Sequence, residues 1–200
     1  WNDADFKNTG FDNIKIALHK DATGFCKQLD LFRSVMPRTK FVYITGNHED
    51  WLRQFTDKYP QMNDLTLESL LSLKKRKIQL VRQGGYYKIG KLYFVHGDQY
   101  GTENPAKQAV TRCHHSVIMG HHHNHIVWSD YSDVASDVKH LGIVVPCYCP
   151  RAPEYGKGRP NRWVSGFFWA NIKPSGKFSC GVQLVSKDGH FISQEGKEYK

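Results

Sequence analysis

A short apolar run that leads into a glycine and a group of histidines constrains this chain more than any other feature. Residues 116–119 are followed by Gly120, and imidazoles stand at positions 121, 122, 123 and 125. A buried strand that stops at Gly120 would leave these side chains on a loop at the carboxyl edge of a sheet, where open α/β sheets hold ligands. Histidines clustered in this way predict a metal site rather than a solvated polar loop.

The spacing of the histidines suggests which of them act together. His121 and His123 are two residues apart, so in an extended loop both rings would point to the same side and reach one metal ion or two adjacent ions. His122 would then point the other way, and His125 is a further candidate. A tag is not expected, because the run lies in mid-chain between hydrophobic segments.

The same order of strand, glycine and polar side chain occurs at two other places. The run KFVYIT at 40–45 leads into Gly46-Asn47-His48, and LYFV at 92–95 leads into His96-Gly97-Asp98. An asparagine oxygen can bind a metal ion and a neighbouring histidine can donate a proton. Three such strand ends predict loops that converge on one site.

Two charged groups are better explained as helix ends than as catalytic groups. Glu49 and Asp50 open a predicted helix at 51–59, where acidic side chains suit the positive end of the helix dipole. The basic group at 74–77 follows a helical pattern, so favourable charge at a helix C-terminus explains it at least as well as a binding role does.

Periodicity predicts an α/β fold in a single domain that spans residues 1–200. A long loop at 146–160 is expected to border the site, and the tail at 196–200 is expected to be loose. We expect helices over much of 13–35 and at 51–59, 66–73 and 104–112. We expect strands at 40–45, 78–81, 86–90, 91–95, 116–119, 126–128, 143–145, 163–172 and 178–185, with a final short strand after a turn at 187–189.

Composition predicts a folded globular chain, with 40% hydrophobic residues and 13% aromatic residues. No apolar run reaches the roughly 20 residues of a membrane span, and no leader opens the sequence, so we expect a cytoplasmic protein without a membrane partner. Five cysteines at scattered spacings do not form a disulfide framework. Cys147 and Cys149 could pair as thiolate ligands, but small buried residues are the preferred interpretation.

The charge balance favours a polyanionic partner. Lys and Arg outnumber Asp and Glu by 28 to 19, which gives a net charge of +9. Such an excess attracts nucleic acid or a phosphorylated substrate, although it does not indicate a fold.

The three strand ends together resemble a known family. Gly46-Asn47-His48-Glu49, the isolated His96 in V-H-G-D, and Gly120-His121-His122-His123 as G-H-x-H look like the last three signatures of the calcineurin-like metallophosphoesterases. Their order and separation also fit, and the resemblance runs from about residue 1 to residue 185. The segment at 163–167, which enters a pair of strands, resembles the closing hairpin of phage and bacterial members. Any one motif alone would be weak, whereas the joint match is specific.

The resemblance implies an α/β/β/α sandwich with two divalent metal ions at the strand ends, which activate a water molecule for attack on phosphorus. Asn47, His96 and His121 would bind one ion and His123 the other. His48 would bind neither ion and would act as a general acid on the leaving oxygen. An amide oxygen and imidazoles suit Mn, Fe, Zn or Ni better than Mg or Ca.

The sequence also departs from this family. Full members carry D-x-H on a first strand and G-D-x-x-D on a second, and neither motif is present upstream of residue 46. Asp3 would be the last carboxylate of G-D-x-x-D if Gly and Asp preceded Trp1. We therefore expect a carboxyl-terminal portion of a longer phosphoesterase that lacks its first strands. The chain alone would bind one metal ion better than two, with weak activity or none.

The leading hypothesis is a metal-dependent phosphoesterase, a hydrolase of phosphodiesters or phosphomonoesters. Nucleic acid is the first choice of substrate, which would make the protein a nuclease, while phosphoprotein, nucleotide and small phosphodiester substrates stay open. The alternative is a non-catalytic module that binds nucleic acid or protein and retains the fold with an incomplete metal site. The missing carboxylates favour this alternative for the 200 residues as written.

Overall fold

The structure is a computed structural model that describes residues 10–130, 140–149 and 161–199. Asp3, most of the polar segment at 129–140 and residues 150–160 of the long loop lie outside the described residues. The chain divides into two compact units, Trp1–Arg82 and Gln83–Lys200, and each is described by itself.

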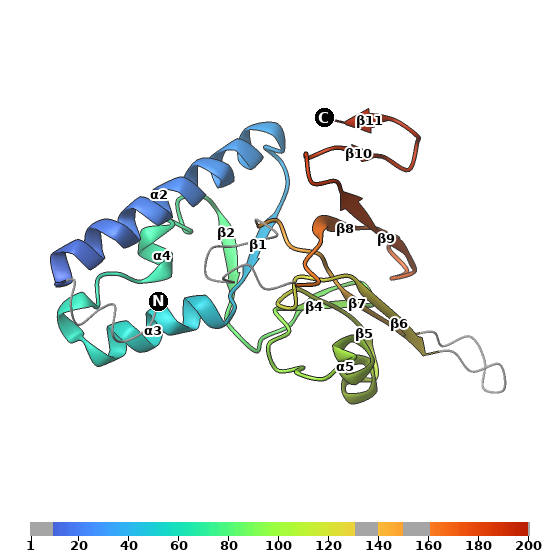
Figure 1. Ribbon diagram of the computed structural model, residues 1–200, viewed down its shortest axis with the longest axis horizontal. Coiled ribbons are helices and arrows are strands. Elements are labelled where there is room, and N and C mark those ends of the chain that lie inside the picture. Colours follow the sequence, from blue (N-terminus) through green and yellow to red (C-terminus); the bar gives the residue numbers. More distant parts are fainter. Residues whose placement is uncertain (1–9, 131–139, 150–160, 200) are drawn as a thin grey trace. The chain divides into compact units, whose positions relative to one another are not determined.

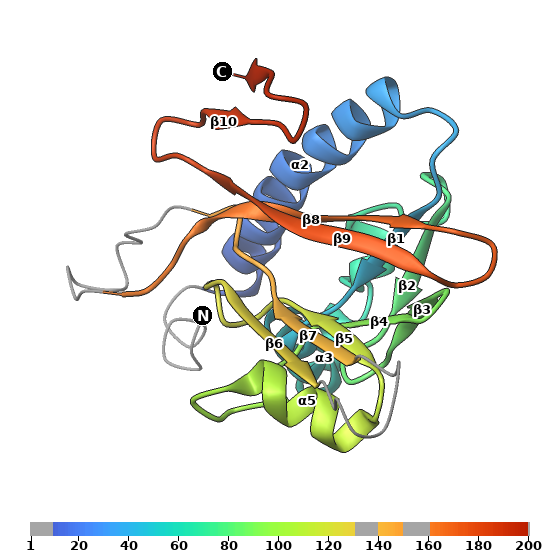
Figure 2. The same cartoon turned by 90° about the vertical axis from the view of Figure 1, so that its right-hand side faces the viewer.

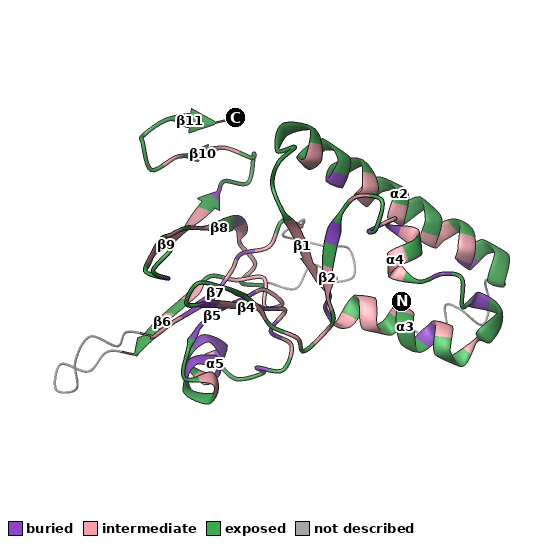
Figure 3. Ribbon diagram, turned by 180° about the vertical axis from the view of Figure 1, so that it is seen from behind, coloured by how far each residue is buried: buried purple, intermediate pink, exposed green. Residues whose placement is uncertain are grey.

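In the first unit, helices pack against one face of a pair of parallel strands, β1 and β2 (Figure 1). Apolar residues at helical spacing give α2 a buried side that includes Ile14 and Leu29, whereas most of its surface is exposed (Figure 3). The elements are α2 (Phe11–Val35), β1 (Phe41–Ile44), α3 (Asn47–Lys58), a short 3-10 helix (Pro60–Met62), α4 (Leu67–Leu70) and β2 (Ile78–Val81).

Helix α3 begins earlier than expected, at Asn47 instead of residue 51. The carboxylate of Glu49 accepts a hydrogen bond from the backbone N–H of Gly46 at 2.8 Å and another from the Tyr43 hydroxyl at 2.9 Å. These bonds hold the first turn of the helix, so the interpretation of Glu49 as a helix-start residue is confirmed. The Asp50 carboxylate accepts hydrogen bonds from Arg53 and Gln54, which places it too in the helix-start role.

Helix α4 is shorter than expected because its end is a Schellman motif. Ser72 has a left-handed backbone with φ +47°, and its N–H bonds to the Ser69 carbonyl. The N–H of Leu73 returns to the Glu68 carbonyl. The basic group at 74–77 therefore lies in turns beyond the helix, where the Arg76 side chain pairs with Asp30.

The second unit is built on a five-stranded sheet with the order β3-β4-β5-β7-β6, in which β4, β5 and β7 are parallel (Figure 2). A tight turn at Gly90 joins β3 to β4, as predicted. The elements are β3 (Tyr87–Ile89), β4 (Leu92–Val95), α5 (Pro105–Cys113), β5 (Ser116–Met119), β6 (Ile126–Asp130), β7 (His140–Val144), β8 (Ser165–Ile172), β9 (Phe178–Val185), β10 (Phe191–Ile192) and β11 (Glu198–Tyr199).

This sheet has a layer on each face. Because side chains alternate along a strand, Val117 and Met119 of β5 pack toward one side and Ile118 toward the other. On the first side, Ala106 and Ala109 of α5 complete a buried cluster. On the second side, the antiparallel pair β8–β9 covers the sheet with Phe168, Ala170, Ile172, Phe178, Cys180 and Val182.

The α/β class is confirmed, since the described residues contain four α-helices and several sheets. The expectation of a loose tail was wrong for residues 198 and 199, because β11 pairs with β10 and the rings of Phe191 and Tyr199 stack at 4.9 Å. Within the described ranges, no helix combines the length and apolar character that crossing a bilayer requires.

Candidate metal centre

The predicted histidine loops of the second unit follow adjacent parallel strands. Strands β4, β5 and β7 run in the same direction, so the segments that follow them share the carboxyl edge of the sheet. The N–H of Val145 bonds to the Met119 carbonyl at 2.7 Å, which extends the pairing to the last residue of β5. His96, the loop at 120–125 and residues 145–149 therefore emerge at one edge.

His96 and His121 are brought together, as the sequence predicted. The Nε2 atom of His96 lies 3.1 Å from the Nδ1 atom of His121, and both rings are half-buried. Two imidazole nitrogens that each lie about 2.1 Å from one ion are about 3.0–3.4 Å apart in octahedral or tetrahedral geometry. The observed separation thus fits two ligands of a single transition-metal ion.

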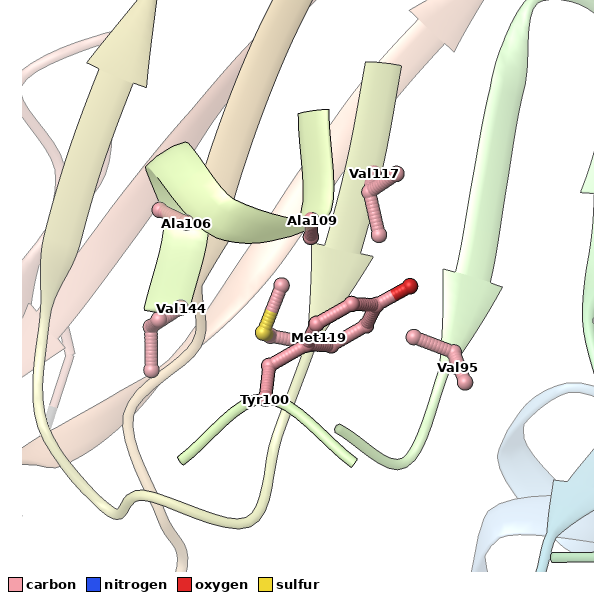
Figure 4. Close-up of a cluster of buried hydrophobic side chains, with 7 residues drawn as sticks. All are labelled: Val95, Tyr100, Ala106, Ala109, Val117, Met119 and Val144. Carbon is pink, nitrogen blue, oxygen red and sulfur yellow. The ribbon is translucent and has the colours of Figure 1, made fainter. Parts of the chain in front are cut away.

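The close approach of Gly97 to Met119 holds the His96 loop and the loop at 120–125 at this distance. Gly97 has φ +109°, and a Cβ built on it would lie 3.0 Å from the Cβ of Met119. Met119 is fully buried beside Tyr100 and Val95 (Figure 4). A side chain at 97 would therefore collide with the end of β5, so the glycine of V-H-G-D lets the His96 loop close over that strand.

The backbone of the histidine loop is not extended, which corrects the expectation for His121 and His123. Their φ angles are +64° and +57°, in the left-handed region that few non-glycine residues adopt. The N–H of His122 bonds to the Gly120 carbonyl at 2.7 Å, so a γ-turn bends the chain around His121. Strained conformations of this kind cluster at functional sites.

Buried polar atoms without partners accompany the histidines. The Oδ1 atoms of Asp98 and Asn124 and the Nε2 atom of His122 are buried and meet no hydrogen-bond partner among the described residues. The other carboxylate oxygen of Asp98 accepts a hydrogen bond from the Gln83 amide. Since buried polar atoms are normally paired, these three atoms are candidates for contact with a bound ion, water or ligand.

His122 is turned into the protein rather than toward solvent. Burial lowers the pKa of His122, and the neighbouring His121 ring lowers it further, while backbone groups of Gly97 and Tyr100 oppose both effects. A lowered pKa keeps the imidazole neutral at physiological pH. His125, the further candidate, is exposed.

His123 has a different set of neighbours, the thiols of Cys147 and Cys149. One ligand atom from each of the three residues lies within 4.8 Å of the others, so the group could hold a metal ion. The Nδ1 atom of His123 is 3.7 Å from the Cys149 sulfur. The two cysteines are half-buried and form no disulfide, so the alternative of thiolate ligands stays open beside the interpretation of small buried residues.

The Cys149 thiol is protonated in the absence of an ion. Burial, followed by the hydrogen bond with Cys147, raises the pKa of Cys149 to about 11. The Cys147 sulfur donates to the Val164 carbonyl at 3.4 Å. A bound cation would displace the Cys149 proton, because the thiolate is the ligand form.

The other two predicted site residues, Asn47 and His48, belong to the first unit. Both lie in the first turn of α3, directly after β1, so the predicted order of strand, glycine and polar side chain is observed. Asn47 is half-buried, whereas His48 is exposed and stacks on Trp51 with ring centroids 4.7 Å apart.

Sequence reasoning did not assign a role to Asp98, and it preferred a packing role for the cysteines at 147 and 149 to that of thiolate ligands. The position of the cysteines in the sequence indicates their place in the fold, because they follow an apolar run that forms a third parallel strand, β7. A residue that follows such a strand shares an edge with the residues that follow its neighbours.

In comparisons with known proteins, no protein family, curated protein or solved structure matches the chain.

Proposed function

We propose that the protein is a metal-dependent phosphoesterase of the calcineurin-like type, with the ligands that the sequence motifs suggest. The observation that carries the proposal is the 3.1 Å separation of the His96 and His121 nitrogens at the ends of adjacent parallel strands. The layers of helix, sheet and two-stranded ribbon in the second unit support the sandwich fold of that family.

The donor set fits a divalent transition metal. Imidazole nitrogens favour Mn, Fe, Zn or Ni, and an amide oxygen from Asn47 is compatible with the same ions. The Oδ1 atoms of Asp98 and Asn124 are buried oxygen acceptors on the same two loops as His96 and His121. When bound, a pair of such ions would act as Lewis acids on the phosphoryl group and on the attacking water.

Each of the predicted site residues would have its own role in the reaction. His96 and His121 hold their ligand nitrogens together, and His123 serves the second ion, as the resemblance implies. His48, which is exposed at the start of α3, would donate a proton to the leaving oxygen, as the resemblance implies. Its stacking on Trp51 orients the ring.

A nucleic-acid substrate is favoured within this class. The net charge of +9 attracts polyanions, and the exposed lysines 74, 75 and 77 form one local concentration of charge. Hydrolysis of an oligonucleotide should therefore weaken with rising salt more steeply than hydrolysis of a small diester. Equal salt dependence for the two substrates would argue for a small phosphodiester.

The proposal is tested with His48→Ala in the full-length protein. Turnover of a dinucleotide phosphodiester, whose alkoxide leaving group needs a proton, should fall by about 10²–10⁴-fold, the usual contribution of a general acid. Metal content, measured by elemental analysis, should not change, because His48 binds neither ion.

His19→Ala is the matched control, since His19 is an exposed histidine of the same unit. This variant should keep full turnover. Loss of metal in His48→Ala would make His48 a ligand, and unchanged turnover would remove its role as the acid. Absence of any phosphoesterase activity in the metal-loaded wild-type protein would overturn the function itself.

A further inference from the structure

Three segments that are distant in sequence are joined by backbone hydrogen bonds around His123. The Val164 N–H donates to the His123 carbonyl at 2.9 Å, and the Cys147 N–H donates to the Val164 carbonyl at 3.0 Å. The Gly166 N–H returns to the Cys147 carbonyl at 3.2 Å. These bonds fix the backbone from which the side chains of His123 and Cys147 project.

The ring of His123 is held in place as well. Trp163 packs edge-on against it, with ring centroids 4.3 Å apart and an interplanar angle of 67°. The Nδ1 atom then faces the Cys149 sulfur at 3.7 Å. Three potential ligands are thus positioned by the fold before any ion arrives, which lowers the cost of binding.

The separations suit a thiophilic ion. With metal–sulfur and metal–nitrogen distances of about 2.3 and 2.1 Å, a tetrahedral ion places sulfur and nitrogen about 3.6 Å apart and two sulfurs about 3.8 Å apart. The distance between His123 and Cys149 is 3.7 Å, and all three ligand atoms lie within 4.8 Å of one another. Closure onto an ion therefore needs side-chain adjustments rather than a change of backbone.

We propose that His123, Cys147 and Cys149 bind one zinc ion, with the fourth position of the tetrahedron open to water or to a ligand. Two thiolates and an imidazole select zinc or a similarly soft ion over Mn and Mg. The half-buried side chains leave a path for the ion to enter. The bound ion would tie the loop after β5 to the segment after β7, next to the start of β8.

This inference does not depend on phosphoesterase activity. The family resemblance assigns His123 to an ion whose other ligands would lie upstream, whereas the thiols give His123 co-ligands within the described residues. The two proposals therefore differ on the co-ligands of His123, whereas the His96–His121 position is not part of the thiol site.

Cobalt(II) titration of the metal-free protein tests the proposal. Thiolate coordination to cobalt gives a charge-transfer absorption in the near ultraviolet, which imidazole and carboxylate ligands do not give. The band should saturate when one cobalt ion per chain occupies the thiol site, and it should disappear when zinc is added. Cys147→Ala and Cys149→Ala should each weaken the band by about half or more, and His123→Ala should lower the cobalt affinity at least about tenfold.

Matched controls come from the same unit. Cys180→Ala removes a half-buried thiol of β9, and His125→Ala removes an exposed histidine of the same loop. Both should titrate like the wild type. Absence of the band in the wild-type protein, or its persistence in the Cys147→Ala Cys149→Ala double variant, would overturn the proposal.

Alkylation of the wild-type protein gives a second measurement that needs no variant to fold. Zinc should slow iodoacetamide modification of Cys147 and Cys149 by at least about tenfold and leave Cys26 unaffected, as judged by peptide mass spectrometry. Equal rates with and without zinc would contradict the site. In His96→Ala, a preserved cobalt band together with lost ester hydrolysis would separate this site from the phosphoesterase centre.

Discussion

The Nε2 atom of His96 lies 3.1 Å from the Nδ1 atom of His121, although the two residues are 25 positions apart in the sequence. The contact follows from topology, because β4 and β5 are adjacent and parallel, and each ends just before its histidine. Without a metal ion, two imidazoles at this distance form one hydrogen bond between their ring nitrogens. With a metal ion, both nitrogens can bind it.

Replacing Gly97 tests whether its close approach to Met119 sets this distance. Gly97→Ala introduces a Cβ at 3.0 Å from the Met119 Cβ and imposes a side chain at φ +109°. We expect a loss of about 1–3 kcal/mol in the free energy of unfolding and weaker metal binding, measured by denaturation and calorimetry. Gly101→Ala is the control, because nothing lies within 4 Å of its added Cβ. Equal stability of the two variants would contradict the role of Gly97.

The Tyr100 hydroxyl should make the free energy of unfolding depend on pH in the alkaline range. Burial raises the pKa of Tyr100, helped by its hydrogen bonds with Cys113 and Tyr86. The unfolded chain releases this proton near pH 10, whereas the folded chain retains it, so the unfolded state binds fewer protons above about pH 10. Stability should be insensitive to this group below pH 9 and should fall as pH rises beyond 10.

Tyr100→Phe should flatten that alkaline decline, as measured by urea denaturation at pH 8 and pH 11. The variant is compared with the wild type at each pH, so any constant loss of packing cancels. An unchanged slope in Tyr100→Phe would show that Tyr100 is not a source of the alkaline decline.

The cap of α5 gives a prediction about the scaffold beneath the site. The Asn104 Oδ1 atom accepts a hydrogen bond from the Lys107 N–H at 2.9 Å, and α5 packs on the sheet that carries the histidine loops. Asn104→Ala should lower the free energy of unfolding by about 1 kcal/mol. Asn104→Asp retains the acceptor and should stay close to the wild type, whereas equal losses would show that the cap contributes little.

A substitution in helix α2 should raise the free energy of unfolding instead of lowering it. Gly24 is exposed within this 25-residue helix, and nothing lies within 4 Å of a Cβ added there. Gly24→Ala should stabilise the protein by roughly 0.5–1 kcal/mol, since glycine is a poor helix former. Thermal unfolding monitored by circular dichroism would measure the gain, and a lower midpoint than that of the wild type would contradict it.

The strands and the histidine pair were predictable because local pattern and topology agree. Residues 117–119 form a continuous apolar run, and β5 is buried on both faces, as a central parallel strand requires. Polar residues directly after such runs must lie at one sheet edge, so His96 and His121 could be expected to meet.

Other features depend on interactions that no local pattern reveals. The two-residue strands β10 and β11 are too short for a period, and the stacking of Phe191 on Tyr199 accompanies their pairing. The left-handed backbone of His121 and His123 replaces the extended loop that spacing alone suggested. Cys147 meets Val164 across 17 residues, so its place beside His123 is a tertiary result.

Manganese titration of the metal-free, full-length protein tests the central claim most directly. Mn²⁺ prefers oxygen and nitrogen ligands to thiolates, so calorimetry reports the His96–His121 position rather than the thiol group. His96→Ala and His121→Ala should each lower the Mn²⁺ affinity at least about tenfold, while His125→Ala, at an exposed position, should not change it. Wild-type affinity in the His96→Ala His121→Ala double variant would show that these two histidines do not bind the ion.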